Sequence, residues 1–195
     1  MPKTLESVIE IGSTGIRLVV CQRTIDGQLN VVDKSELPIS LGWDVFTSRI
    51  VSRETQLQCI KILSRFKEQL AGWGIKPEQN SIIATSALRE AINRDTVLDR
   101  IFVKTGFKVK IIDGIEENFY MYTAVLESLQ NDCPEIKTQN SLILEIGGGS
   151  TEIMLLNKGK MAVVHSLRLG TVIIEQNIKS LHGTQQDTRH YLRDY

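Results

Sequence analysis

Apolar residues recur along the chain with two different periods, which predict strands near its beginning and helices further on. Val8–Ile11 and Ile16–Cys21 are apolar runs separated by a small polar turn, and Gln28–Lys34 follows the turn pair Asp-Gly. Short apolar runs bounded by turn residues are typical of strands, so we expect an antiparallel meander of three strands. Glu36–Val51 shows neither period and is expected to be an irregular, packed loop.

Helical spacing begins after Ser52, a residue type that caps helix N-termini. From there the apolar residues recur every three or four positions, which predicts one long amphipathic helix that ends near Gly72–Gly74. Its apolar positions are Leu57, Ile60, Leu63, Phe66 and Leu70. Further strands are expected at Ser81–Ala84, Lys108–Ile112 and Met161–Leu167, and further helices at Asp95–Val103, Ile115–Leu129 and Thr171–Leu181.

The strand Ser81–Ala84 runs into Thr85–Ala91, where two hydroxyl residues precede good helix formers. A strand that ends at a helix N-terminus is a favourable place for an anion. Arg89 lies within reach of such an anion, although an exposed helix arginine is an equally good interpretation of the spacing. Glu116 and Glu117 begin a later helix, where acids suit the helix dipole and a functional role requires one of them to face a cleft.

The chain is organised around an apolar hairpin, Ser141–Leu156, whose turn contains three consecutive glycines. The glycines remove every side chain from the bend, so backbone N–H groups can approach a bound group and point at it. Two hydroxyl residues follow them. The pattern favours an oxyanion, phosphate above all, over a plain hairpin without a ligand; its candidate binding residues are Gly147, Gly148, Gly149, Ser150 and Thr151.

The same pattern occurs near the start of the chain. Val8–Val20 is again an apolar run that ends in Glu-Ile-Gly, followed by a small polar turn and an apolar strand. Gly12, Ser13 and Thr14 are the candidate phosphate-binding residues of this turn. Two copies suggest two half-sites that face each other across a cleft, although short apolar hairpins are common enough for chance to produce a pair.

Composition narrows the class of protein. The 195 residues carry 23 basic and 23 acidic side chains, so no overall positive field points to nucleic acid and any anion site must be local. Three scattered cysteines, without metal spacing, favour a reducing cytoplasm over a disulfide framework. The sequence also shows no signal peptide and no apolar run long enough to span a bilayer, so neither secretion nor a membrane is expected.

The length allows one domain and a fraction. Residues 1–130 are expected to form the first domain with the first phosphate turn, and the polar, proline-containing stretch 131–140 a linker. Residues 141–195 then begin a second domain with the second turn. Two elements after the hairpin, followed by the polar stretch His182–Tyr195, are too few to enclose its sheet, so this domain looks truncated.

Five segments in order resemble the exopolyphosphatase/guanosine pentaphosphate phosphohydrolase (Ppx/GppA) family. They are IEIGSTGIRLVV, IIATSALREAINRD, IIDGIEENFYMYTAV, LILEIGGGSTEI and SLRLGTV, which together cover nearly the whole chain. The family belongs to the actin/hsp70/sugar-kinase superfamily. The resemblance therefore implies an α/β fold of the ribonuclease-H-like type, with a mixed sheet flanked by helices, a phosphate-binding cleft, and an incomplete second domain of the same type.

The resemblance also implies an activity and a set of residues. The activity is release of the terminal phosphate from inorganic polyphosphate or guanosine pentaphosphate, with Mg²⁺ as cofactor and a water molecule as the attacking group. By position, Glu117 matches the family's catalytic glutamate and Arg89 its cleft arginine, while Glu145 and Glu152 match acids of the second turn that serve catalysis. Glu10, Glu145 and Glu152 offer the oxygen ligands that Mg²⁺ prefers.

Three departures from the family pattern leave alternatives open. Glu10 and Glu145 stand where the family has aspartate, the family's EEAR stretch is EENF, and family members are considerably longer. These features favour a catalytically weakened or inactive regulator that binds phosphate chains with the same fold. A sugar or acetate kinase-like enzyme is disfavoured by the ATSALREA segment. Exposed apolar surface on an incomplete second domain could also pair two copies into a homodimer.

Overall fold

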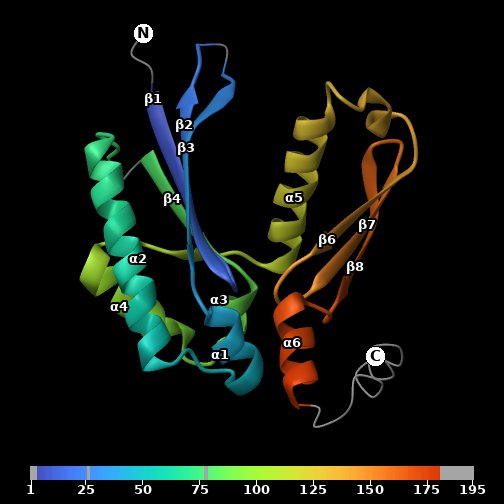
Figure 1. The fold of residues 1–195 in the computed structure, drawn as a ribbon. Coiled ribbons are helices and arrows are strands. Elements are labelled where there is room, and N and C mark those ends of the chain that lie inside the picture. Colours follow the sequence, from blue (N-terminus) through green and yellow to red (C-terminus); the bar gives the residue numbers. More distant parts are fainter. Residues whose placement is uncertain (1–3, 26, 77–78, 181–195) are drawn as a thin grey trace. The chain divides into compact units, whose positions relative to one another are not determined.

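The computed structural model describes residues 4–25, 27–76 and 79–180 of the chain. The structure has two compact units, Met1–Glu117 and Asn118–Tyr195 (Figure 1). In the described residues, no helix is long and apolar enough to cross a membrane.

A five-stranded mixed sheet forms the centre of the first unit, in the order β3-β2-β1-β4-β5. The predicted meander is confirmed, because β1 pairs antiparallel with β2 and β2 with β3, while β4 joins β1 in parallel. Asp26, in the predicted Asp-Gly turn, lies outside the described residues. The strand bounds are β1 Thr4–Ile11, β2 Gly15–Arg23, β3 Leu29–Pro38, β4 Asn80–Ala84 and β5 Lys110–Ile111.

Four helices belong to this unit: α1 Leu41–Ser48, α2 Arg53–Gly72, α3 Ser86–Glu90 and α4 Arg94–Thr105. The predicted cap is confirmed, since the Ser52 hydroxyl accepts a hydrogen bond of 3.2 Å from the backbone N–H of Thr55. The expected loop at Glu36–Val51 was wrong. Strand β3 continues to Pro38 because it pairs with the whole of β2, and α1 follows at once, with Leu41 and Val45 fully buried.

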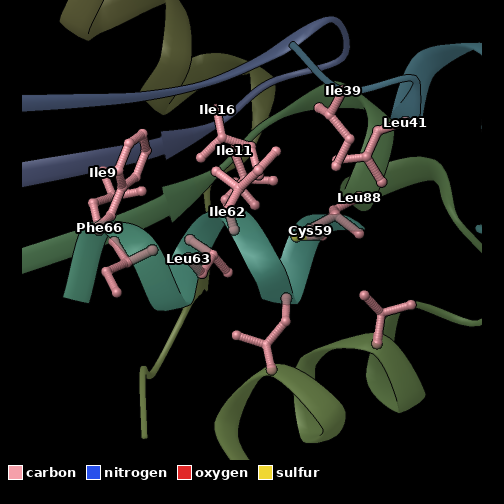
Figure 2. Close-up of a cluster of buried hydrophobic side chains, with 14 of the residues drawn as sticks. Ile9, Ile11, Ile16, Ile39, Leu41, Cys59, Ile62, Leu63, Phe66 and Leu88 are labelled. Atoms are coloured by element: carbon pink, nitrogen blue, oxygen red, sulfur yellow. The ribbon is translucent and has the colours of Figure 1, made fainter. Parts of the chain in front are cut away.

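The core of the first unit lies between the sheet and α2 (Figure 2). Ile9, Ile11 and Ile16 point from the strands toward α2, which contributes Leu63 and Phe66 at helical spacing. The exposed fractions of these five side chains are at most 2%. The strand at Lys108–Ile112 was predicted too long, because only Lys110–Ile111 pairs with β4.

Cys59 of α2 is buried in this core, and its burial raises the pKa of the thiol to about 12. We expect native protein at pH 8 to leave Cys59 unmodified by iodoacetamide, because the thiolate is the nucleophile. Mass spectrometry should find modification first at Cys21 and Cys133, which are partly exposed. Modification of Cys59 as fast as Cys133 in folded protein would contradict this.

The same shift makes stability depend on pH. Since folding raises the pKa of the Cys59 thiol from 9.0, the neutral thiol stabilises the fold below pH 9, and this contribution is lost as pH rises further.

The second unit is a three-stranded antiparallel sheet in the order β6-β7-β8, packed on one long helix. The predicted glycine hairpin is confirmed, since β6 pairs with β7 from Ser141↔Leu156 to Ile146↔Thr151. Ile143 and Met154 of the sheet are buried against side chains of the long helix such as Val125. The bounds are α5 Gly114–Leu129, η2 Pro134–Lys137, β6 Ser141–Ile146, β7 Thr151–Asn157, β8 Lys160–Leu167 and α6 Thr171–Ser180.

The two units divide between Glu117 and Asn118, within the first turns of α5, and not at the linker expected at 131–140. The physical reason is that the apolar side of α5 packs on the second sheet. The stretch 131–140 is itself part of that unit, because η2 buries Ile136 in the same core. Helix α6 lies where a helix was expected, while Leu181 and the polar stretch His182–Tyr195 lie outside the described residues.

The other face of the second sheet carries exposed aliphatic side chains. In register they form rows across the three strands, as in Leu142↔Leu155 and Leu155↔Val163. Their exposed fractions range from 44% to 61%, for Leu142, Leu144, Ile146, Leu155, Val163 and Leu167. Apolar faces of this kind normally pack against another layer. This agrees with the expected incomplete second domain. That the second domain is incomplete, and that this surface pairs two copies, both stay predictions.

Candidate active site

The second glycine turn is held by the first turn of α6. Gly147 donates its N–H to the Ser150 carbonyl at 2.8 Å, which closes the bend between β6 and β7. The carbonyl of Gly147 then accepts from Thr171 N–H at 2.9 Å, and that of Gly148 from Val172 N–H at 3.0 Å. The N-terminal amides of α6, which no helix can satisfy internally, are thus satisfied by the turn.

These two hydrogen bonds fix the direction of the neighbouring amides. In a planar trans peptide the C=O of one residue and the N–H of the next point in opposite directions. Because the carbonyls of Gly147 and Gly148 point toward α6, the N–H groups of Gly148 and Gly149 point away from it. Among the described residues, none accepts a hydrogen bond from either amide. The turn therefore presents two adjacent donors of the kind that hold a phosphate oxygen.

Gly170 makes this arrangement possible, and the motif SLRLGTV gave only a hint of it. A Cβ atom at Gly170 would lie 2.2 Å from the carbonyl oxygen of Gly148 and 2.4 Å from the nitrogen of Gly149. The backbone before α6 can approach the glycine turn only without a side chain here. Thr151 ties the same two segments together, because its buried hydroxyl is close enough to the Leu169 carbonyl to donate a hydrogen bond, at 2.5 Å.

The first turn, between β1 and β2, is fixed by the segment that leads into α1. Gly12 donates its N–H to the Gly15 carbonyl at 2.9 Å, and the Ser13 carbonyl accepts from Gly42 N–H at 2.7 Å. By the same peptide geometry, the N–H of Thr14 points away from Gly42. The hydroxyl of Ser13 is buried and lies 3.0 Å from the hydroxyl of Ser86 at the start of α3, whereas Thr14 is exposed.

Arg89 and Glu117 form an ion pair that the sequence did not predict. A guanidinium nitrogen of Arg89 donates to the Glu117 carboxylate at 2.9 Å and to the Ile112 carbonyl at 2.8 Å. Arg89 comes from α3, just after β4, and Glu117 from the first turn of α5, where its N–H bonds to the Asp113 carbonyl at 3.0 Å. About a third of each side chain remains exposed, so the carboxylate is both oriented and accessible.

Glu10, a candidate metal ligand, forms an ion pair with an arginine of the neighbouring strand. Its carboxylate lies 3.1 Å from a guanidinium nitrogen of Arg17, which also pairs with Glu36 at 3.0 Å. Burial by itself would lower the pKa of Arg17, but its hydrogen bond and charge interaction with Glu10, and then with Glu36, raise the pKa overall. One guanidinium is thus shared by two carboxylates, so Arg17 compensates only part of their negative charge.

Glu145 and Glu152, the other two candidate metal ligands, lie on neighbouring strands of the second sheet. They are directly opposed across β6 and β7, where side chains share one face about 5 Å apart and like charges repel. Glu152 also accepts from the Ser166 hydroxyl at 2.7 Å and faces the Asn118 amide nitrogen at 3.5 Å. The amide oxygen of Asn118 is buried and has no hydrogen-bond partner among the described residues. It is the amide nitrogen of Asn118 that faces Glu152, so the carboxylate oxygens of Glu145 and Glu152 are the donors that suit a hard divalent cation here.

The described residues contain no cluster of three or more histidine, cysteine, aspartate or glutamate side chains that could hold a metal ion. Glu10 lies in the first unit, and Glu145 and Glu152 lie in the second. Their convergence on one ion, like the convergence of the two glycine turns on one phosphate chain, stays a prediction.

The mixed sheet, the flanking helices and the glycine turns define an α/β protein of the actin-like ATPase fold. Solved structures agree: an Aquifex aeolicus Ppx/GppA protein matches with a TM-score of 0.74 and 26% identity, over 98% of this chain and 60% of that one. An exopolyphosphatase from Cytophaga hutchinsonii matches in fold, with a TM-score of 0.81 and 22% identity over 98% of this chain and 59% of its own.

The chain belongs to the Ppx/GppA phosphatase family, whose model matches residues 19–194. The expected family is thereby confirmed. A bifunctional 3-dehydroquinate synthase/phosphatase from Fusobacterium nucleatum is 27% identical over 98% of this chain and 29% of its own length. A guanosine-5'-triphosphate,3'-diphosphate pyrophosphatase from Vibrio atlanticus is 28% identical over 90% of this chain and 34% of its own. The chain thus spans about a third of these curated relatives.

Proposed function

We propose that the chain carries part of the catalytic site of a phosphohydrolase that releases the terminal phosphate from inorganic polyphosphate or guanosine pentaphosphate. The observation that carries the proposal is the second glycine turn, whose Gly148 and Gly149 amides point away from α6 and have no partner among the described residues. Membership of a phosphatase family gives that donor pair a phosphate to bind.

The ion pair supplies the other half of the proposed chemistry. Hydrolysis of a phosphoryl group requires a placed water molecule and compensation of negative charge on the phosphate oxygens. Glu117 orients the water and accepts its proton, and Arg89 holds the carboxylate in place through a 2.9 Å contact. Amides of both glycine turns and the Thr14 and Ser150 hydroxyls bind oxygens of the phosphate chain.

Magnesium is the expected cofactor, and Glu145 and Glu152 are the residues that would hold it. Their carboxylates are opposed on neighbouring strands of the second sheet and offer the hard oxygen donors that the ion prefers, and Glu10 is the third candidate ligand. When bound, the ion would neutralise charge on the phosphate oxygens. The residues of this chain would hold the ion in position and would set the geometry of the second glycine turn beside it.

The alternative function is that of a regulator that binds phosphate chains with little or no turnover. The departures from the family pattern favour it, since Glu10 and Glu145 stand where the family has aspartate and the EEAR stretch is EENF. The test is phosphate release from polyphosphate, with Mg²⁺, by the full-length protein that contains this chain. Release supports the hydrolase, whereas binding of polyphosphate without release supports the regulator.

Arg89→Gln should lower kcat of the full-length enzyme about 100-fold with little change in KM for polyphosphate. The reason is that Arg89 holds Glu117, and a misplaced catalytic group costs about that factor. Steady-state kinetics of phosphate release would measure both constants. Arg65→Gln, an exposed arginine of α2, is the matched control and should behave as wild type. A large rise in KM with unchanged kcat would instead place Arg89 on the substrate.

A further inference from the structure

The outer side of the first unit has an apolar groove that the proposed hydrolysis does not use. It lies between α2 and α4, has a volume of about 370 Å³, and is lined by the aliphatic side chains of Leu57, Ile60 and Val103. Leu57 and Ile60 are three positions apart, so they lie on one face of α2. This is a site within a single unit, formed by two helices that pack against each other.

Ile60 is partly buried against the core, but Leu57 and Val103 are not part of it. Both helices already bury a separate face, with Leu63 and Phe66 of α2 and Ile101 of α4 all at most 2% exposed. Leu57 is 59% exposed and Val103 is 76% exposed. Both are aliphatic side chains with charged neighbours on a solvated helix face. Exposed aliphatic residues gathered at a groove on an otherwise polar face are typical of an interaction site.

The rim of the groove is positively charged and largely uncompensated. Arg53, Arg100 and Lys104 line it, against the single acid Asp99. Among the described residues, the side chains of Arg53 and Lys104 have no ion pair or hydrogen bond. The guanidinium of Arg100 donates at 2.6 Å to Gln56, a neutral amide that fixes its direction without neutralising its charge.

We propose that this groove binds an amphipathic helix of a partner protein, with aliphatic residues spaced three or four apart and glutamate or aspartate beside them. The aliphatic side chains of the partner helix would pack on Leu57, Ile60 and Val103, and its acids would pair with the three cations of the rim. A furrow between two helices that is open to solvent accommodates a third helix, whereas an acyl chain needs a closed apolar tunnel. The proposal is independent of the hydrolytic activity.

The test is binding of a fluorescein-labelled synthetic peptide to the full-length protein, followed by fluorescence anisotropy. The probe is an acidic amphipathic helix with leucines four apart and flanking glutamates; its counterpart has every glutamate replaced by lysine. We expect the acidic peptide to bind at least 10-fold more tightly than the basic one, and more weakly as salt rises, because surface charges are screened.

Leu57→Glu and Val103→Glu should each weaken binding of the acidic peptide at least 10-fold. Both side chains are exposed, so the variants should fold, which circular dichroism would verify. The matched control is Ile92→Glu: Ile92 is 74% exposed in the same unit but does not line the groove, and its variant should bind as wild type.

Three outcomes would overturn the proposal. Equal binding of the acidic and basic peptides would show that the positive charges of the rim do not select the partner. Displacement of the peptide by laurate at the laurate's own dissociation constant would indicate a lipid site instead. Failure of the acidic peptide to bind would show that the groove has no helical partner of this chemistry, because another part of the protein covers it or because it stays in solvent.

Discussion

Glu117→Gln should lower kcat for phosphate release by the full-length enzyme between about 100- and 10,000-fold, which is the range that a general base contributes. Glutamine has the size of glutamate but cannot accept the proton of the attacking water. It can still accept a hydrogen bond from Arg89 through its amide oxygen, so the local structure should persist. Release of phosphate from polyphosphate in the presence of Mg²⁺, measured with a colorimetric phosphate assay, gives the rate.

The same helix offers a matched control for this variant. Glu127 is an exposed glutamate near the end of α5, and Glu127→Gln should leave the rate unchanged. Binding of polyphosphate by Glu117→Gln should also be retained, because the glycine-turn amides are intact. A Glu117→Gln enzyme that releases phosphate as fast as wild type would remove Glu117 from the mechanism, whatever the wild-type rate is.

Gly170→Ala should unfold or distort the second unit. The added Cβ would lie 2.2 Å from the Gly148 carbonyl oxygen, far inside the 3.0 Å that real Cβ contacts respect, and the obstacle is backbone. Overpacking costs about 1–3 kcal/mol. Loss of the two hydrogen bonds from α6 to the turn adds about 0.5–1.5 kcal/mol each. A total near 3 kcal/mol would lower the Tm of a unit the size of Asn118–Tyr195 by about 12–24 °C.

Differential scanning calorimetry would measure this effect, and the transition of the second unit should move most. The comparison variant is Gly72→Ala at the end of α2, where an added Cβ would meet no atom within 4 Å. Alanine is a better helix former than glycine, so this variant should be as stable as wild type or more stable by up to about 1 kcal/mol. If Gly170→Ala matched Gly72→Ala in Tm, α6 would not depend on close contact with the glycine turn.

Local pattern was sufficient for the regular elements of the fold. The period of α2 was evident because one face must stay apolar over 20 residues, and the strands of both hairpins because they are apolar runs between turn residues. Helix α1 was missed for the opposite reason. Its eight residues are too short for a clear period, and it forms because Gly42 N–H bonds to the Ser13 carbonyl of the first turn, 29 positions earlier.

The candidate site divides in the same way. Glycine turns and acidic residues are properties of a few adjacent positions, so the sequence by itself determined that two such turns exist and which family the chain belongs to. Only the tertiary structure decided that Arg89 pairs with Glu117, that Arg17 pairs with Glu10, and that Gly170 lets α6 bind the carbonyls of the second turn. Each of these contacts joins residues from separate elements, and no spacing along a chain specifies which side chains folding will bring together.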